Sequence, residues 1–169
     1  AYRILLQEDC PSWGYMVKNN GTTMWERWDG WTEADGVRGS LNHFAFGCVC
    51  EWLQTTVAGI DIDPEQPGYK HIIMRPVPGG GLSSAQATHD SMYGTIVSSW
   101  NIDNNSFAWQ ITIPPNTTAE IHLPGEQGSI TEGGHPVDKA DSVSFVRSEN
   151  DCSTFEIGSG SYNFSTRIG

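Results

Sequence analysis

The stretch SFAWQITIP, residues 106–114, decides the class of the fold. Its large apolar side chains occupy every second residue and therefore share one face of an extended strand. These side chains are Phe107, Trp109, Ile111 and Ile113. Polar or small residues alternate with them, and prolines end the run. The pattern predicts a half-buried β-strand whose Trp109 belongs to a hydrophobic core rather than to an exposed surface.

Short runs of the same kind occur on both sides of this stretch and are separated by turn residues such as the Gly-Gly-Gly of 79–81. They cover residues 71–77, 84–89, 95–101, 118–123, 142–147 and 152–157. About seven or more short strands at regular spacing are typical of an antiparallel β-sandwich. We therefore predict a β-sandwich domain over residues 69–169.

The first sixty residues have a different pattern. Residues 1–9 are consistent with the last turns of a helix that Pro11 would stop. The glycine-rich residues 12–35 favour loops and short extended pieces. From Leu41 the apolar residues recur at steps of three and four, which predicts an amphipathic helix with Ser40 as its N-cap, ending near Gly59.

Residues 61–68 contain two prolines, several acids and no periodicity, so they are predicted to form a linker. Their acids lack the regular ligand spacing and the central glycine of a calcium loop, and no metal is implied. The chain as a whole is therefore expected to be mixed in fold class and mainly β by residue count.

Charge and composition exclude several kinds of partner. Nine basic and twenty acidic side chains give a net charge of −11, which repels nucleic acid phosphates and anionic lipid surfaces. No apolar stretch reaches the roughly twenty residues that span a bilayer. Seven tryptophans and nineteen glycines suit a β-rich protein that binds carbohydrate, although tryptophans also serve as core residues.

Four cysteines show no metal-binding spacing. Cys48 and Cys50 are two residues apart in a helical pattern and point to different faces. Cys10 and Cys152 fall in different predicted domains. We expect free and mostly buried thiols rather than a disulfide framework.

The segment TTMWERWDGW, residues 22–31, carries the most informative chemistry. Glu26 lies between tryptophans and beside charged neighbours, an arrangement that can adjust the basicity of its carboxylate. Inverting glycoside hydrolysis needs two carboxyl groups, one acid and one base, and Glu26 suits either role. The alternative is a surface ion pair of Glu26 with Arg27 or Arg38, and spacing alone favours that alternative.

Several motifs in this order resemble one known family. They are PSWGY at 11–15, TTMWERWD at 22–29, SLNHFAFG at 40–47, AGI at 58–60, PGYKHI at 67–72, Arg75-Pro76, IPPNTTA at 113–119 and EIGSG at 156–160. They resemble the closing part of bacterial and fungal α-L-rhamnosidases, which are inverting glycoside hydrolases. The resemblance implies that residues 1–60 end an (α/α)6 barrel of six helical hairpins, that 61–68 are a linker, and that 69–169 are the C-terminal β-sandwich.

The same resemblance implies a role for two residues of the chain. Glu26 matches the general base, which deprotonates the water that attacks the anomeric carbon. His43 matches a histidine that contacts bound rhamnose, the alternative being a core or capping role. The expected ligand is a rhamnose-containing glycoside, and no cofactor or metal is implied.

The neighbours of Glu26 have supporting roles by the same resemblance. Trp25, Trp28 and Trp31 are expected to shape the sugar pocket or its walls, with at least one of them serving only for packing. Arg27 and Asp29 are expected to orient Glu26 or to pair with one another.

The general acid of the family belongs to helices and loops upstream of these residues. The remaining carboxylates, Asp9, Glu33, Asp35 and Glu51, lie outside any motif of the acid. We therefore expect the chain alone to be inactive and to need the N-terminal part of the barrel as a partner. Without it, Trp13, Tyr15, Phe44 and Trp52 are expected to lack packing partners.

A second hypothesis comes from a different class of protein. Residues from 69 onward would then act as a noncatalytic carbohydrate-binding or structural module. The aromatic residues expected to be exposed in that half are Tyr93, Trp100 and Tyr162.

Overall fold

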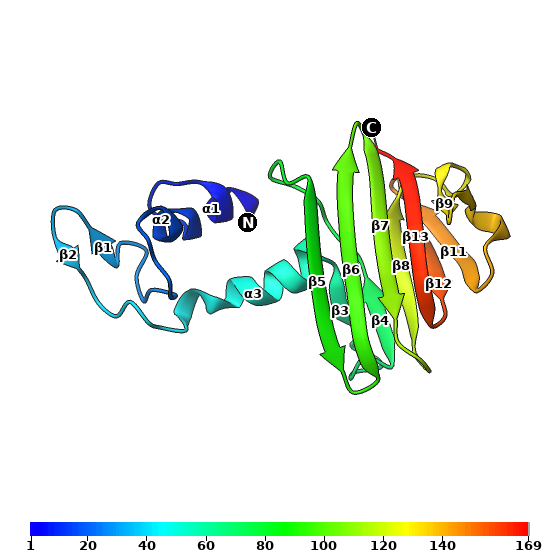
Figure 1. Cartoon of the computed structure of the whole chain (residues 1–169), viewed down its shortest axis with the longest axis horizontal. Helices are drawn as coiled ribbons and strands as arrows, with labels where there is room; N and C mark the ends of the chain where they lie inside the picture. The colour runs from blue at the N-terminus through cyan, green and yellow to red at the C-terminus, as the bar shows by residue number, and fades with distance from the viewer. Residues whose placement is uncertain (169) are drawn as a thin grey trace. The chain divides into compact units, whose positions relative to one another are not determined.

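The structure is a computed structural model that describes residues 1–168 (Figure 1). Its backbone contacts divide the chain into two compact units. Residues 1–52 and 79–81 make up the first unit, and residues 53–78 together with those from 82 onward make up the second. No helix described between residues 1 and 168 is long and apolar enough to cross a membrane.

The first unit consists of short helical elements and one small hairpin. Its elements are α1 (Tyr2–Leu6), α2 (Trp13–Lys18), β1 (Trp31–Thr32), β2 (Gly36–Val37), the 3-10 turn η1 (Ala45–Cys48) and α3 (Val49–Trp52). The helix expected at the start of the chain is confirmed as α1, which ends well before Pro11.

Helix α2 lies in a segment that was predicted to lack helices, so that part of the prediction is wrong. Ser12 caps it, because its hydroxyl accepts a hydrogen bond from the Tyr15 amide at 2.8 Å and donates one to the Gln7 carbonyl at 2.6 Å. Gly14 permits close packing there, since a Cβ atom at this position would lie 2.3 Å from the Gln7 oxygen. Capping and tertiary packing outweigh the low helix propensity of glycine.

The predicted helix from Leu41 begins four residues later than expected, at Ala45. Ser40 is not its N-cap, because the Ser40 hydroxyl accepts a hydrogen bond from the Asn42 amide at 3.1 Å in a local turn. Phe44 consequently lies outside the helix with 86% of its surface exposed. The predicted end is confirmed: a π-helical turn, η2 (Leu53–Val57), is followed by Gly59 with a φ of +81°.

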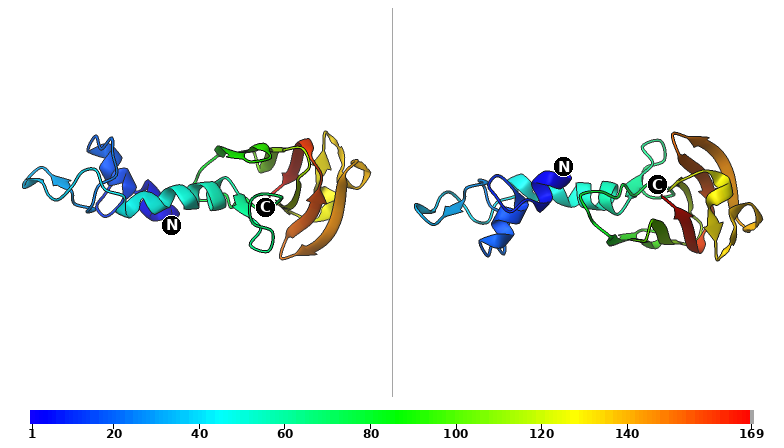
Figure 2. Two further views of the ribbon diagram at one scale, coloured as in Figure 1. Left: turned by 90° about the horizontal axis from the view of Figure 1, so that it is seen from below. Right: turned by 90° about the horizontal axis from the view of Figure 1, so that it is seen from above.

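The second unit is a sandwich of two sheets. Its strands are β3 (Ile60–Ile62), β4 (His71–Met74), β5 (Ser84–Ser91), β6 (Gly94–Asp103), β7 (Ser106–Ile113), β8 (Thr118–Pro124), β9 (Thr131–Glu132), β10 (His135–Pro136), β11 (Val143–Glu149), β12 (Cys152–Ile157) and β13 (Gly160–Arg167), with 3-10 turns η3 (Gln127–Ser129) and η4 (Val137–Lys139). One sheet has the order β10-β9-β13-β7-β6-β5 and the other the order β11-β12-β8-β4-β3. Figure 2 shows the red β13 and the orange β11 in different layers.

The predicted sandwich and the predominance of β structure are confirmed, with differences in detail that include the two short strands β9 and β10, which were not predicted. Strands β4 and β8 pair in parallel, whereas the other strand pairs are antiparallel. Strand β3 occupies the start of the predicted linker and pairs with β4. Strand β13 was not predicted. Its buried face carries Tyr162, Phe164 and Thr166 in a period-two pattern, but the serines and the asparagine between them, together with the polar character of Thr166, conceal it.

The alternation in β7 has the predicted consequence. Phe107, Trp109, Ile111 and Ile113 are each no more than 2% exposed. They face buried residues of the other sheet such as Ile121 of β8 and Phe155 of β12, which are 0% and 1% exposed. Each such side chain contributes about 1.5–3 kcal/mol by leaving water, so this interior dominates the stability of the unit.

A hydrogen-bonded chain of buried polar groups connects the sheet to the end of η2. The indole nitrogen of Trp109 donates to the Ser98 hydroxyl at 2.9 Å, and that hydroxyl donates to the Ala58 carbonyl at 2.6 Å. The indole nitrogen of Trp100 donates to the Val57 carbonyl at 2.7 Å. These bonds satisfy the carbonyl groups that the end of a helix leaves without intrahelical partners.

Three expectations about exposure are wrong. Trp100 is 1% exposed and Tyr162 is 7% exposed, so neither offers a free aromatic face. The cysteines are free, as predicted, but they are not mostly buried, because Cys10, Cys48 and Cys50 are all exposed.

We predict that Ser98→Ala destabilises the second unit by about 3 kcal/mol, because it leaves the Trp109 indole N–H and the Ala58 carbonyl buried without a partner. Ser99→Ala is the matched control. Ser99 is the next residue of β6 and faces the other side of the sheet, so its loss should cost less than about 0.5 kcal/mol. Urea unfolding of both variants measures the difference, and equal midpoints would contradict the prediction.

His71 links three segments of the second unit through its side chain. Its Nδ1 lies 2.8 Å from Asp63 Oδ2, and its Nε2 lies 3.2 Å from each oxygen of Glu156. Ionised carboxylates only accept hydrogen bonds, so both ring nitrogens must donate, and only the imidazolium can do this. Burial lowers the pKa of His71, but hydrogen bonds and charge from the two carboxylates outweigh it, and the net pKa is raised above its ordinary value.

The raised pKa of His71 sets the direction of a pH dependence. We predict that the stabilisation from His71 is fully present below about pH 6.5, the pKa of an unfolded histidine, and is lost as pH rises through the raised folded-state pKa. Urea unfolding of the wild type and of His71→Gln between pH 5.5 and 9 measures it. The difference in unfolding free energy should shrink with rising pH, and a difference that stays constant or grows would overturn the assignment.

Candidate functional site

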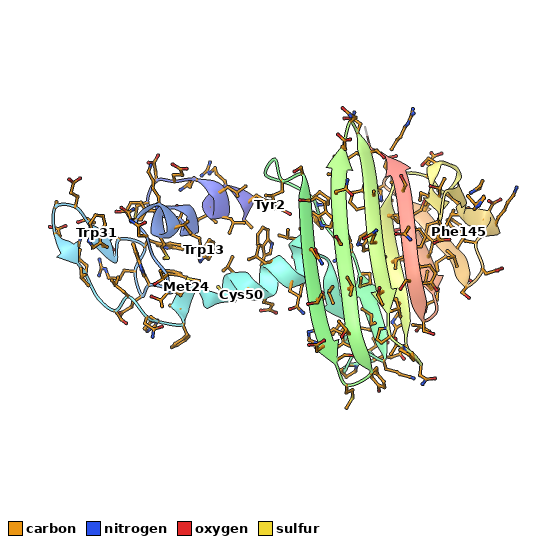
Figure 3. All side chains as sticks on the ribbon, viewed as in Figure 1. Tyr2, Trp13, Met24, Trp31, Cys50 and Phe145 are labelled. Atoms are coloured by element: carbon orange, nitrogen blue, oxygen red, sulfur yellow. The ribbon has the colours of Figure 1, made fainter. Side chains whose placement is uncertain are left out.

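Two segments of the first unit pair side by side and carry the predicted catalytic and sugar-binding residues. The Glu26 amide donates to the Ser40 carbonyl at 2.9 Å, and the His43 amide donates to the Met24 carbonyl at 2.7 Å. The Thr23 hydroxyl adds a bond to the Leu41 carbonyl at 2.5 Å. Figure 3 shows the side chains of Trp13, Met24 and Trp31 on the segments that make up this unit.

The carboxylate of Glu26 is held by one of its two oxygens. Oε2 accepts a hydrogen bond from the Ser40 amide at 2.8 Å, while the side chain stays exposed. Gly39 allows the close approach, because its φ is +79° and a Cβ atom there would lie 3.0 Å from Oε2. Within residues 1–168 no group bonds Oε1, so this oxygen faces outward as a free acceptor.

The charged neighbours of Glu26 pair with one another instead of with it. Arg27 Nε lies 3.0 Å from Asp29 Oδ1, and Arg38 Nη1 lies 2.9 Å from Asp29 Oδ2 and 3.4 Å from Asp35. The hydrogen bond from Arg27 lowers the pKa of Asp29, and the same bond raises the pKa of Arg27. Among the described residues these arginines therefore form ion pairs with aspartates, and the expected pair of Arg27 with Asp29 is present.

His43 has one ring nitrogen engaged and one available. Its Nδ1 accepts a hydrogen bond from the Ala45 amide at 3.1 Å, at the start of η1. The ring also stacks on Phe44, with centroids 4.8 Å apart. An Nδ1 that accepts places the proton of the neutral ring on Nε2, which makes Nε2 a hydrogen-bond donor. The capping role and a ligand role of His43 are therefore compatible.

Trp25 is the centre of the core of this unit and not an accessible wall. It is 2% exposed and meets Tyr15 edge-on, with ring centroids 6.3 Å apart. Cβ atoms added at Gly21 and Gly30 would each lie 3.2 Å from Trp25, so the glycines leave the room that its side chain fills. Trp25 thus serves for packing, as was expected of at least one of the tryptophans.

Trp28 and Trp31 remain half-buried. Trp28 stacks on Phe46 with centroids 3.8 Å apart and meets Trp13 edge-on at 4.9 Å. Trp31 begins the small hairpin, where its carbonyl accepts a hydrogen bond from the Tyr15 hydroxyl at 2.9 Å. The ring contacts hold the Trp28 side chain in place, the hydrogen bond fixes the backbone of Trp31, and part of each side chain stays accessible.

The loss of packing partners expected for four aromatic residues occurs at one of them. Trp13 packs on Trp28, Tyr15 on Trp25, and Trp52 meets Tyr2 edge-on at 4.8 Å. Phe44 stacks on the His43 ring but remains 86% exposed, so most of its surface has no packing partner among the described residues.

Ser40 has a different role from the one that the sequence pattern indicated. Its backbone amide holds the Glu26 carboxylate, whereas the sequence pattern indicated a helix cap. The available signal was the preceding Gly39, whose left-handed conformation turns the chain toward Glu26.

Comparison with known proteins matches both units to one family. Residues 1–57 match the model of the bacterial alpha-L-rhamnosidase 6 hairpin glycosidase domain, and residues 59–138 match that of the bacterial alpha-L-rhamnosidase C-terminal domain. The α-L-rhamnosidase of Streptomyces avermitilis is 40% identical over 97% of this chain, and one from Formosa agariphila is 38% identical over 88% of it.

A solved structure agrees with these matches. The crystal structure of the Streptomyces avermitilis enzyme, complexed with L-rhamnose, has a TM-score of 0.86 and 37% identity over 98% of this chain. The chain belongs to the α-L-rhamnosidase family. It corresponds to the C-terminal portion of these enzymes and spans only 15% and 16% of the two curated relatives and 16% of the solved chain.

We predict that Gly21→Ala destabilises the first unit by about 1–3 kcal/mol, because the added Cβ overpacks the site around Trp25. That Cβ would lie 2.8 Å from the Met16 carbonyl oxygen. Gly47→Ala is the control, since a Cβ there has nothing within 4 Å. Near-ultraviolet circular dichroism during urea unfolding reports on the tryptophans, and equal effects of the two substitutions would contradict this account.

Proposed function

We propose that this chain completes an α-L-rhamnosidase that hydrolyses terminal α-L-rhamnosides with inversion, and that Glu26 is its general base. In an inverting enzyme the base removes a proton from water while the water attacks the anomeric carbon. This chain supplies the base and the C-terminal domain, and the general acid comes from the rest of the longer protein.

The geometry of the Glu26 carboxylate carries the proposal. One oxygen is fixed by the Ser40 amide at 2.8 Å, so the group has a defined orientation. A general base must be held in a fixed position relative to the proton that it removes. The other oxygen is free of bonds to the described residues and can accept a proton from water.

Two neighbouring features support a sugar site around Glu26. His43 lies on the segment that pairs with the Glu26 segment, and its Nε2 is a donor suited to a sugar hydroxyl. Trp28 and Trp31 are half-buried and offer aromatic surface for the CH groups of a sugar ring. The relative of known structure is complexed with L-rhamnose, which supports rhamnose as the sugar.

Exposed apolar side chains of the first unit indicate where the rest of the barrel would pack. Phe44, Val17 and Val37 are 86%, 72% and 62% exposed. Such exposure on a small unit is typical of a surface that a larger assembly covers. In this proposal residues 1–60 close the catalytic barrel, residues 69–169 form the C-terminal domain, and residues 61–68 lie between them with β3 at their start.

The competing hypothesis is a noncatalytic carbohydrate-binding or structural module in the β domain, and its carbohydrate-binding form receives less support. Two of its three candidate aromatics, Trp100 and Tyr162, are buried. The third, Tyr93, has the ammonium group of Lys70 over its ring at 5.3 Å from the centroid. The three aromatics that were expected to carry a sugar-binding platform therefore give it little support.

We predict that Glu26→Gln in the full-length protein lowers kcat on an aryl α-L-rhamnoside by about 10²–10⁴-fold, because the amide cannot take the proton from water. KM should change little, since the side-chain carbonyl oxygen of the glutamine can still accept the hydrogen bond from the backbone N–H of Ser40. Azide, a nucleophile that needs no base, should restore part of the rate. Proton NMR of the first product released by the wild type should show the β-anomer of rhamnose.

Glu33→Gln is the matched control, because Glu33 is an exposed carboxylate on the β1–β2 hairpin of the same unit. It should keep the wild-type rate. An unchanged kcat in Glu26→Gln would remove Glu26 from the mechanism, and an α-anomer as the first product would exclude inversion.

A further inference from the structure

A row of polar side chains crosses the outer face of the five-stranded sheet. Arg147 of β11 pairs with Thr154 of β12, and Thr154 pairs with His122 of β8. Met74 of β4 pairs with Ile121 in parallel, which brings the next residue, Arg75, abreast of His122. Since Met74 and Ile121 are 0% exposed, Arg75 and His122 point away from the core.

These residues enclose a hollow that we name the arginine hollow. It has a volume of about 330 Å³ and is lined by Arg75, His122, Arg147, Glu149, Asn150, Cys152 and Thr154. The row from Arg75 to Arg147 crosses three strand spacings, or about 14 Å. The hollow is therefore larger than an inorganic ion requires, and its volume is at the lower end of that of small-molecule sites.

Neither arginine of the hollow forms a close ion pair with the residues that the structure describes. Arg147 Nη2 lies 3.5 Å from Glu120 Oε1, which is a long contact through a single nitrogen. Arg75 has no ion pair with any of residues 1–168. A guanidinium group has five donors and a planar fork that matches a carboxylate, so both arginines keep donors for a ligand.

His122 contributes a neutral group to the same surface. Its Nε2 lies 2.8 Å from Glu120 Oε1, and its Nδ1 lies 3.5 Å from the Thr154 hydroxyl. Burial lowers the pKa of His122, and the nearby charges of Arg75 and Arg147 lower it further, against the opposing effect of Glu120. The two arginines thus remain the cationic groups of the hollow at neutral pH.

We propose that the arginine hollow binds an acidic saccharide unit, with the two guanidinium groups on its carboxylate. Thr154, Asn150 and Glu149 then serve its hydroxyls, because they combine donors with acceptors. Glu149 can accept hydrogen bonds from the hydroxyls of a sugar acid, and a free sulfate or fully ionised phosphate ion has no such donors. The choice of a saccharide rests on the proposed function, and the site would engage an acidic stretch of a rhamnose-containing polymer.

The hollow is also unusual within this chain. The protein has a net charge of −11 and only nine lysines and arginines, yet two of these arginines line one small hollow. The overall charge would repel an acidic polymer, so local binding requires such a concentration of guanidinium groups.

The test is a titration of the 169-residue chain followed by NMR of the arginine side-chain Nε–H groups at low ionic strength. Sodium D-galacturonate should shift the Arg75 and Arg147 signals with a Kd on the order of 1 mM. D-galactose, the methyl ester of D-galacturonic acid and sodium sulfate should each bind at least ten-fold more weakly. The double substitution Arg75→Gln with Arg147→Gln should raise the Kd for galacturonate at least ten-fold.

Arg167→Gln is the matched control, because Arg167 is an exposed arginine on β13 of the other sheet. It should leave the Kd unchanged. The absence of galacturonate binding, equal binding of sulfate, or binding that survives the double substitution would each overturn the proposal. Because this titration involves no hydrolysis, its outcome is independent of the kcat of Glu26→Gln, and the two proposals can fail separately.

Discussion

The second unit depends on a pair of buried hydrogen bonds. The Trp109 indole donates to the Ser98 hydroxyl, and that hydroxyl donates to the Ala58 carbonyl. The end of a helix presents carbonyl groups that need partners, and the core of a sandwich is otherwise apolar. The Ser98 and Trp100 side chains provide these partners from inside the sheet. Within the second unit, the position of the end of η2 against the sheet is thus set by hydrogen bonds and not only by the contact of apolar surfaces.

Gly59 follows this connection and turns the chain into the sheet. A Cβ atom at this glycine would lie 2.2 Å from the Pro76 nitrogen. The Gly59 carbonyl accepts a hydrogen bond from the Arg75 amide at 2.9 Å. The same turn leads through β3 to β4, whose end places Arg75 on the outer face. The arginine hollow therefore inherits its geometry from the register of β4 and β8.

The candidate catalytic residue depends on a comparable local constraint in the first unit. Glu26 is flanked by charged residues, yet Arg27 and Arg38 are occupied by Asp29. The Ser40 amide binds only one oxygen of the Glu26 carboxylate. Because the surrounding charges pair with one another, Glu26 forms no ion pair with the described residues, which spacing along the chain does not reveal.

Local patterns determined much about this protein. The period-two alternation of residues 106–114 predicted β7 and its buried face, and the ordered motifs predicted the α-L-rhamnosidase family. Glycine and proline turns marked the strands of the sandwich. These features are readable in sequence because each depends on residues that lie close together along the chain.

Only the tertiary structure decided which aromatic residues are accessible and which polar groups meet. Trp25 and Trp100 resemble surface tryptophans in sequence, but packing between distant segments buries them. The role of Ser40 depends on a partner, Glu26, fourteen residues away. Burial, parallel pairing and carboxylate orientation arise from contacts distant in sequence, whereas alternation and turns are local, and this difference separates what was predicted from what was not.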